Sequence, residues 1–159
     1  MLDWFYENTF GQILATLAVS MVPVIELRGA IPIGVALGLP PFWAMLASVI
    51  GNMLPVPFII LFVRHVFTWL KRHSATAGRL VQWLEDKAHN KSAVVIKYRT
   101  IGLCLLVAVP FPGTGAWTGS LVAALLDIPL REAIPTILLG VIIAGLIVTG
   151  ITCGVITIF

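Results

Sequence analysis

The sequence predicts an all-α integral membrane protein. We expect an inverted repeat of two units, each a re-entrant helical hairpin and a transmembrane helix, joined by a cytoplasmic amphipathic helix. Composition favours a membrane protein, because 59% of the 159 residues are hydrophobic and only 11% are charged, whereas soluble domains average about 25% charged. Helix-breaking residues divide the charge-free runs at matching places. These runs are Asn8–Ile25, Gly29–Val63, Thr100–Leu126 and Ala133–Phe159.

Two of these runs do not fit simple spanning helices, which need roughly 20 apolar residues. Gly29–Val63 has 35 residues, too many for one helix and too few for two spans with a turn. Thr100–Leu126 is interrupted by PFPGTG, Pro110–Gly115. Proline removes a helical hydrogen bond and glycine weakens a helix. The segment that remains, 116–126, would cross only about half a bilayer, so we expect hairpins that enter the membrane and return.

The first half of the chain divides into an arm, a break, a short arm and a full span. The arm covers Phe10–Ile25, and the break falls at Glu26–Gly29. A short arm then reaches Leu37, and Pro40 with the proline after it opens a span over Phe42–Val63. An alternative places 26–39 in an aqueous loop after a complete first span.

The second half repeats this order. An arm over Ser92–Val109 precedes the break at Pro110–Gly115, a short arm covers Ala116–Leu126, and Pro129 precedes a span over Glu132–Ile158. We therefore expect one membrane domain with repeats at about 10–63 and 92–159 and a connector at 64–91. At an offset of 89, identical residues fall at matching points: Leu37/Leu126, Pro40/Pro129, Ala44/Ala133 and Gly51/Gly140. GxxxG pairs, which allow close helix packing in lipid, are Gly34/Gly38, Gly115/Gly119 and Gly150/Gly154.

The distribution of basic residues predicts the orientation. Eight of the ten Lys and Arg residues lie between Arg64 and Arg99, so the positive-inside rule places 64–99 in the cytoplasm and both termini outside. Within this block, 74–91 has apolar residues at helical spacing, which predicts an amphipathic surface helix packed on protein or on lipid. The block is flanked by spans and has no binding motif, so we expect no nucleic-acid partner.

Several kinds of chemistry find no support in the sequence. Cys104 and Cys153 lie in apolar runs without a CxxC or histidine partner, so we expect neither a disulfide nor a metal site, and no cofactor. Ser120 follows Gly119, but no lysine or histidine at comparable depth could activate it. We therefore do not expect an enzyme.

The two breaks hold the candidate site. Ionisable residues at membrane depth are usually functional, and Glu26 and Arg28 would lie there. They could form a binding site or a structural salt bridge. The short arms would turn their N-terminal ends, which favour anions, toward the membrane centre. Thr114 and its glycine neighbours could form a nest. The expected substrate- and proton-binding residues are Glu26, Arg28, Gly29, Pro32, Pro110, Pro112, Gly113, Thr114, Gly115 and Trp117.

The stretches ELRGAIPIG (26–34) and PFPGTGAWTG (110–119) resemble the paired signatures of the small multidrug export protein family. That family is similar in architecture to the DedA/VTT membrane proteins. The resemblance covers nearly the whole chain and implies a prokaryotic inner-membrane protein with two facing re-entrant loops and a transport role. The chain has no charge between Thr100 and Leu126, so an arginine of the second DedA-type loop has no counterpart here.

Together these patterns predict a small transporter or flippase. Its expected partners are membrane lipids and a small-molecule or lipid substrate. Arg28 would hold an anionic, lipid-phosphate-like or small amphipathic substrate, and Glu26 would exchange a proton. Alternatives are an exporter of cationic drugs that uses Glu26, and a membrane scaffold or subunit that transports nothing. Two full spans would not enclose a pathway alone, so we expect a homo-oligomer, a dimer.

Overall fold

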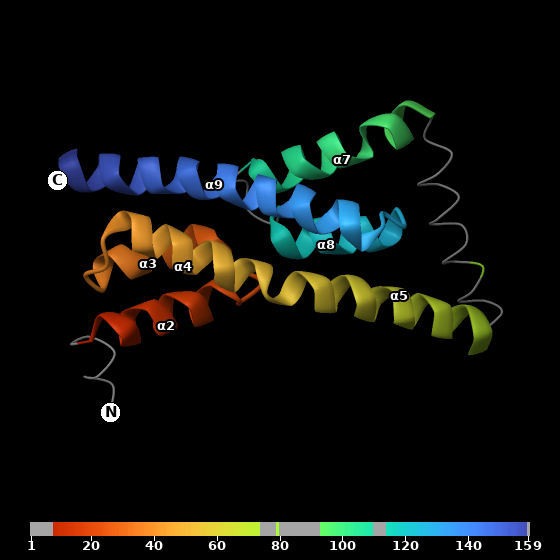
Figure 1. The fold of residues 1–159 in the computed structure, drawn as a ribbon, viewed down its shortest axis with the longest axis horizontal. Helices are drawn as coiled ribbons and strands as arrows, with labels where there is room; N and C mark the ends of the chain where they lie inside the picture. The colour runs from red at the N-terminus through yellow and green to blue at the C-terminus, as the bar shows by residue number, and fades with distance from the viewer. Residues whose placement is uncertain (1–7, 74–78, 80–92, 110–113, 159) are drawn as a thin grey trace.

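A computed structural model describes residues 8–73, 79, 93–109 and 114–158. The described chain is helical with short turns (Figure 1). Hairpins α2–α3 and α7–α8 enter from opposite ends, and their tips meet near the middle. The continuous pair α4–α5 runs antiparallel to α9. The helices are α2 (Thr9–Ser20), α3 (Glu26–Ala36), α4 (Pro41–Met53), α5 (Pro55–His73), α7 (Ala93–Ala108), α8 (Ala116–Leu125) and α9 (Leu130–Ile158).

The first break lies earlier than the sequence predicts. The turn covers 21–25, and α3 begins at Glu26, so the expected break at Glu26–Gly29 is wrong. Pro23 lies within this turn and cannot donate a backbone hydrogen bond. Gly29 and Pro32 are both accommodated inside α3. The polar pair of the ELRG stretch therefore belongs to the first turn of the short helix.

The expected span over Phe42–Val63 is confirmed as part of a segment long and apolar enough to cross a membrane, Pro41–Trp69, but it is interrupted and ends later than predicted. Helix α4 ends at Met53, and α5 begins at Pro55 and continues to His73. Pro55 and Pro57 each remove a helical N–H donor, which explains the interruption at Leu54. The second half follows its predicted boundaries within two residues. The expected amphipathic helix at 74–91 lies outside the described residues.

The turns that follow the two short helices are built alike. Gly38 and Asp127, 89 residues apart, both have positive φ, of 100° and 53°. Glycine and aspartate are among the residues that adopt this conformation most readily at helix ends. The next residues, Leu39 and Ile128, are both buried. Equivalent backbone bonds close both turns: Gly38 N to Val35 O and Leu39 N to Gly34 O, and Asp127 N to Ala124 O and Ile128 N to Ala123 O.

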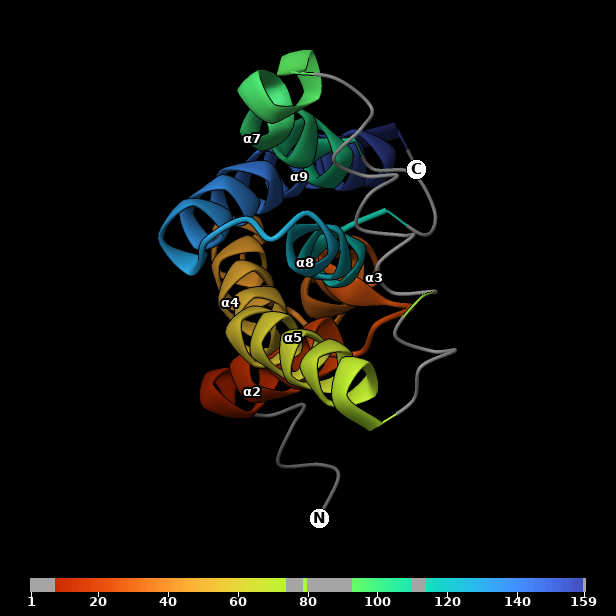
Figure 2. The ribbon, with the colours of Figure 1, turned by 90° about the vertical axis from the view of Figure 1, so that its right-hand side faces the viewer.

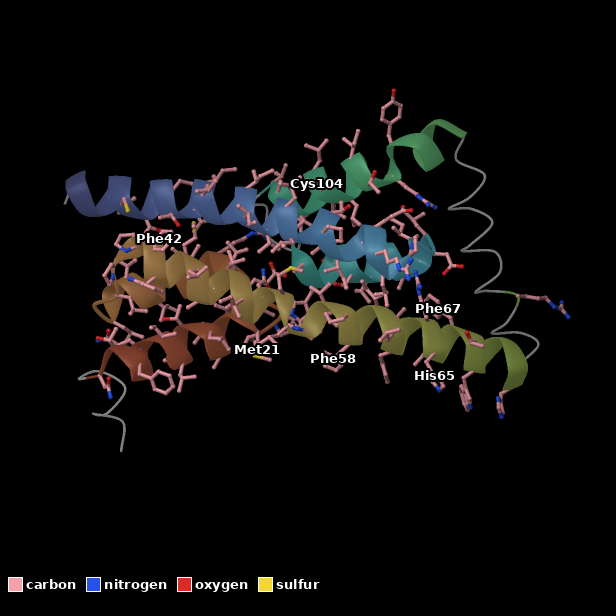
Figure 3. The ribbon with its side chains drawn as sticks, viewed as in Figure 1. Met21, Phe42, Phe58, His65, Phe67 and Cys104 are labelled. Atoms are coloured by element: carbon pink, nitrogen blue, oxygen red, sulfur yellow. The ribbon has the colours of Figure 1, made fainter. Side chains whose placement is uncertain are left out.

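The two ends of the bundle differ in chemistry. At one end, ion pairs tie neighbouring helices together. The opposite end has exposed aromatic side chains, Phe42 among them (Figure 3), and the helices of the ion-paired end expose Trp69 and Tyr98 as well. The ion pairs are Arg64–Asp127 at 3.6 Å and Arg99–Glu132 at 3.3 Å, and the aromatic residues of the opposite end are Phe10, Phe42 and Trp43.

The core joins both halves of the chain. Viewed along the bundle, α8 lies between α5 and the α7–α9 pair (Figure 2). Buried apolar residues of the short helices, the long helices and α7 form one cluster. Glycines allow the closest approaches, since a Cβ at Gly34 would crowd Thr16 and Ala44, and one at Gly119 would crowd Val107. Gly150 and Gly154 have open space around them.

Candidate functional site

The tips of the two hairpins are joined through Trp117, the second residue of α8. Its indole Nε1 donates to the Met21 carbonyl in the first turn, at 3.3 Å. Its backbone N–H donates to the Glu26 carboxylate. Met21 lies near the middle of the long axis of the molecule (Figure 3). The first N–H groups of a helix have no partner inside the helix and favour negative charge, so Glu26 caps α8 from the other half of the chain.

Glu26 itself has an unusual backbone conformation. Its φ is 50°, in the left-handed region that glutamate rarely adopts. Its N–H donates to the Val22 carbonyl at 2.9 Å, and its side chain is only 5% exposed. Backbone strain of this kind costs about 1–3 kcal/mol and clusters at functional sites. The conformation lets one residue end the turn, start α3 and direct its carboxylate at α8.

Gly115 leaves room for this carboxylate. A Cβ built on Gly115 would overlap both oxygens of the Glu26 side chain. The φ of Gly115 is 160°, which is extended backbone. The glycine is therefore required for close approach and not for a left-handed backbone. Gly113 lies outside the described residues.

Arg28 contacts the tip of the second hairpin through hydrogen bonds of its own. Its Nη2 donates to the Val109 carbonyl at 3.2 Å and to Thr114 Oγ1 at 3.1 Å. Thr114 Oγ1 in turn donates to the Val109 carbonyl at 2.9 Å. Arg28 also interacts electrostatically with Glu26. Both charged residues of the first hairpin thus bind the second hairpin. A salt bridge that only stabilised its own turn would not make these contacts.

A groove of about 620 Å³ opens beside this junction, between α3 and the C-terminal half of α9. Arg28 supplies its charge, and Thr152 supplies one hydroxyl group. The other walls are apolar. Sites for small molecules typically combine apolar walls with a few polar groups. The lining residues are Arg28, Pro32, Val35, Ala36, Val148, Ile151, Thr152 and Val155.

The structure brings together Glu26, Arg28, Thr114, Gly115 and Trp117 among the predicted site residues. Pro32 lines the groove, and Gly29 packs its backbone against the Ile25 side chain inside α3. Pro110, Pro112 and Gly113 lie outside the described residues. The carbonyl groups of Met21 and Val109 complete the junction, and sequence reasoning missed them because a backbone acceptor has no residue signature.

The described helices and their junction define the class of protein. Two of them, Pro41–Trp69 taken through its interruption and Leu130–Val155, are long and apolar enough to cross a bilayer. By length and composition these two helices fit a membrane protein.

Comparison with known families places the chain within this class. Residues 26–147 match the family described as "Putative small multi-drug export protein", and the chain belongs to this family. The family description names export, which suggests a transporter. Searches of curated proteins and of solved structures found no match.

Proposed function

We propose that the protein is a small transporter or flippase whose site lies at the membrane midplane, where two re-entrant hairpins of an inverted repeat face each other. The observation that supports this most directly is the crossing of Arg28 and Glu26 to the second hairpin tip. Irregular backbone at membrane depth needs shielding by protein or a water-filled cavity. The matching turns at Gly38 and Asp127, and the antiparallel long helices, support the repeat.

The substrate that this site favours is an anionic amphiphile. Arg28 has the planar fork of donors that suits phosphate or carboxylate, and the apolar groove beside it would take a hydrocarbon portion. The anionic group would compete with Val109 and Thr114 for the Arg28 donors. Membrane lipid would enter the groove from its open side. A second copy of the chain would complete the enclosure of the transport pathway.

Export of cationic drugs is the second candidate, and the family description names drug export without giving the charge of the drug. A cation would have to approach Glu26. That carboxylate is buried and faces the positive N-terminal end of α8, an arrangement that opposes a cation. We assign Glu26 to proton exchange during transport because acidic residues at membrane depth form proton relays in transporters.

Reconstitution of the purified chain alone into liposomes tests this function. One assay follows inward flipping of a fluorescent lipid phosphate, and the other follows uptake of ethidium, each with an imposed pH gradient. We expect lipid flipping to exceed that of protein-free liposomes and to depend on the gradient. Ethidium uptake alone would support the cationic-drug alternative. Activity in neither assay, with correctly folded protein, would favour a scaffold or subunit.

The orientation gives a separate prediction. We expect both termini to be extracytoplasmic and the ion-paired end, with Arg64 and Arg99, to face the cytoplasm. A reporter that is active only outside the cytoplasm should be active when fused before residue 1 and when fused after residue 159. A reporter that is active only in the cytoplasm should be inactive in both fusions. A cytoplasmic N-terminus with an external C-terminus would contradict the inverted repeat.

A further inference from the structure

The first repeat contains a buried polar cluster that the proposed transport site does not use. Ser20, at the end of α2, donates its hydroxyl to the Ser48 carbonyl at 2.5 Å. Ser48 and Asn52 lie one turn apart on α4, so they share a face. All three are fully buried. Within the described part of the chain, neither amide atom of Asn52 nor the Ser48 hydroxyl has a hydrogen-bond partner.

Packing does not require polar residues at these positions. The residues 89 positions later, at the same points of α9, are Ile137 and Val141, and both are fully buried. The second half therefore fills the equivalent positions with apolar side chains. Burying an amide or hydroxyl without a partner is unfavourable, and apolar residues would avoid this cost. The presence of polar groups at Ser48 and Asn52 is thus explained best by a ligand that these groups bind.

The surroundings of the cluster are rich in backbone oxygen. Because Pro55 and Pro57 have no N–H, the carbonyls of Gly51 and Met53 lose their helical donors. The last turn of α2 also presents carbonyl groups, and the Leu17 carbonyl contacts Gly51 so closely that a Cβ there would overlap it. A helix C-terminus has a negative partial charge. Neutral oxygen atoms of this kind are ligands for a cation.

The cluster lies level with Glu26. Helices α3 and α4 are antiparallel neighbours, and Gly34 packs against Ala44. Glu26 precedes Gly34 by eight residues, and Asn52 follows Ala44 by eight, so both lie at the same height in the bundle. A ligand bound at Asn52 would therefore lie at the same level of the bundle as the hairpin junction.

We propose that Ser48, Asn52 and the backbone carbonyls at the α4–α5 interruption form a binding site for an alkali-metal cation. Interrupted helices in transporters use unwound carbonyls and half-helix C-terminal ends in this way. All of the ligands are neutral oxygen atoms. A set of neutral oxygen ligands without a carboxylate fits a monovalent ion better than a multivalent one. This inference does not depend on the proposed substrate or on Glu26.

Thermal unfolding of the purified full chain in detergent, followed by tryptophan fluorescence, tests the site. Sodium, lithium and potassium chloride are each titrated against choline chloride at constant ionic strength and pH. Binding to the folded state raises the unfolding temperature as the cation concentration rises. We expect at least one of the three ions to raise it above the choline value. Asn52→Val should abolish the shift, and Ser48→Ala should reduce it.

Two controls separate this site from other effects. Ser120→Ala removes a buried hydroxyl that is bonded within its own helix, to the Ala116 carbonyl, and should keep the shift. Glu26→Gln should also keep it, which distinguishes failure of the cation site from failure of the transport proposal. Absence of a shift with all three ions in the unmodified protein overturns the inference. So does a full shift in Asn52→Val.

Discussion

Substituting Gly115 is expected to disrupt the hairpin junction. A Cβ at this position would overlap the Glu26 carboxylate, so Gly115→Ala must displace Glu26 from the Trp117 N–H. Overpacking costs about 1–3 kcal/mol, and a hydrogen bond to a charged group contributes about 1.5–3 kcal/mol. We expect a large loss of transport for Gly115→Ala and complete loss for Gly115→Leu. Liposome transport and thermal unfolding measure the two effects.

The chain offers a matched control for this substitution. Gly150 lies in α9 with open space around it, so Gly150→Ala introduces the same methyl group without a clash. Alanine in a helix interior is more stable than glycine by about 0.5–1 kcal/mol. We expect Gly150→Ala to unfold at the same or a slightly higher temperature and to retain transport. If both alanine variants behave alike, the contact between Gly115 and Glu26 has no role in function.

Single substitutions of Glu26 and of Arg28 are expected to affect different steps of transport. Arg28→Lys keeps the charge but loses the planar fork of donors that suits a phosphate or carboxylate, while the bonds to Val109 and Thr114 come from Nη2 alone. Loss of one charge-assisted bond corresponds to about 1.5–3 kcal/mol, or about ten- to a hundredfold in substrate affinity. Glu26→Gln keeps an acceptor oxygen for the Trp117 N–H but cannot exchange a proton. We therefore expect substrate binding to persist and the dependence of transport on the pH gradient to disappear.

A charge swap separates this hypothesis from a simple salt bridge. If the pair only stabilises its own turn, Glu26→Arg combined with Arg28→Glu should restore both stability and transport. The structure predicts no rescue, because an arginine at 26 would place a donor and a positive charge at the N-terminal end of α8. Thermal unfolding and pH-dependent uptake of the two single variants and the swap give the answer. Rescue of both properties would contradict a site at these residues.

Helix content and most helix ends could be predicted because they depend on local chemistry. Pro129 and the PFPGTG stretch set the boundaries of α8 and the start of α9 almost as expected. The errors arose where several breakers compete. Near the first break, Pro23, Gly29 and Pro32 all disfavour a helix, and the chain breaks at the turn containing Pro23 while packing holds the other two inside α3.

An apolar helical chain with two helical hairpins, two long helices and charges gathered toward one end could be predicted from the residues alone, because composition and helix breakers act locally. The folded arrangement was needed to show that Glu26 caps α8, that Arg28 binds Val109 and Thr114, and that Gly115 leaves room for a carboxylate. These contacts join residues more than 80 positions apart. Their partners include backbone N–H and C=O groups, which every residue has, so the sequence alone does not reveal which of them meet.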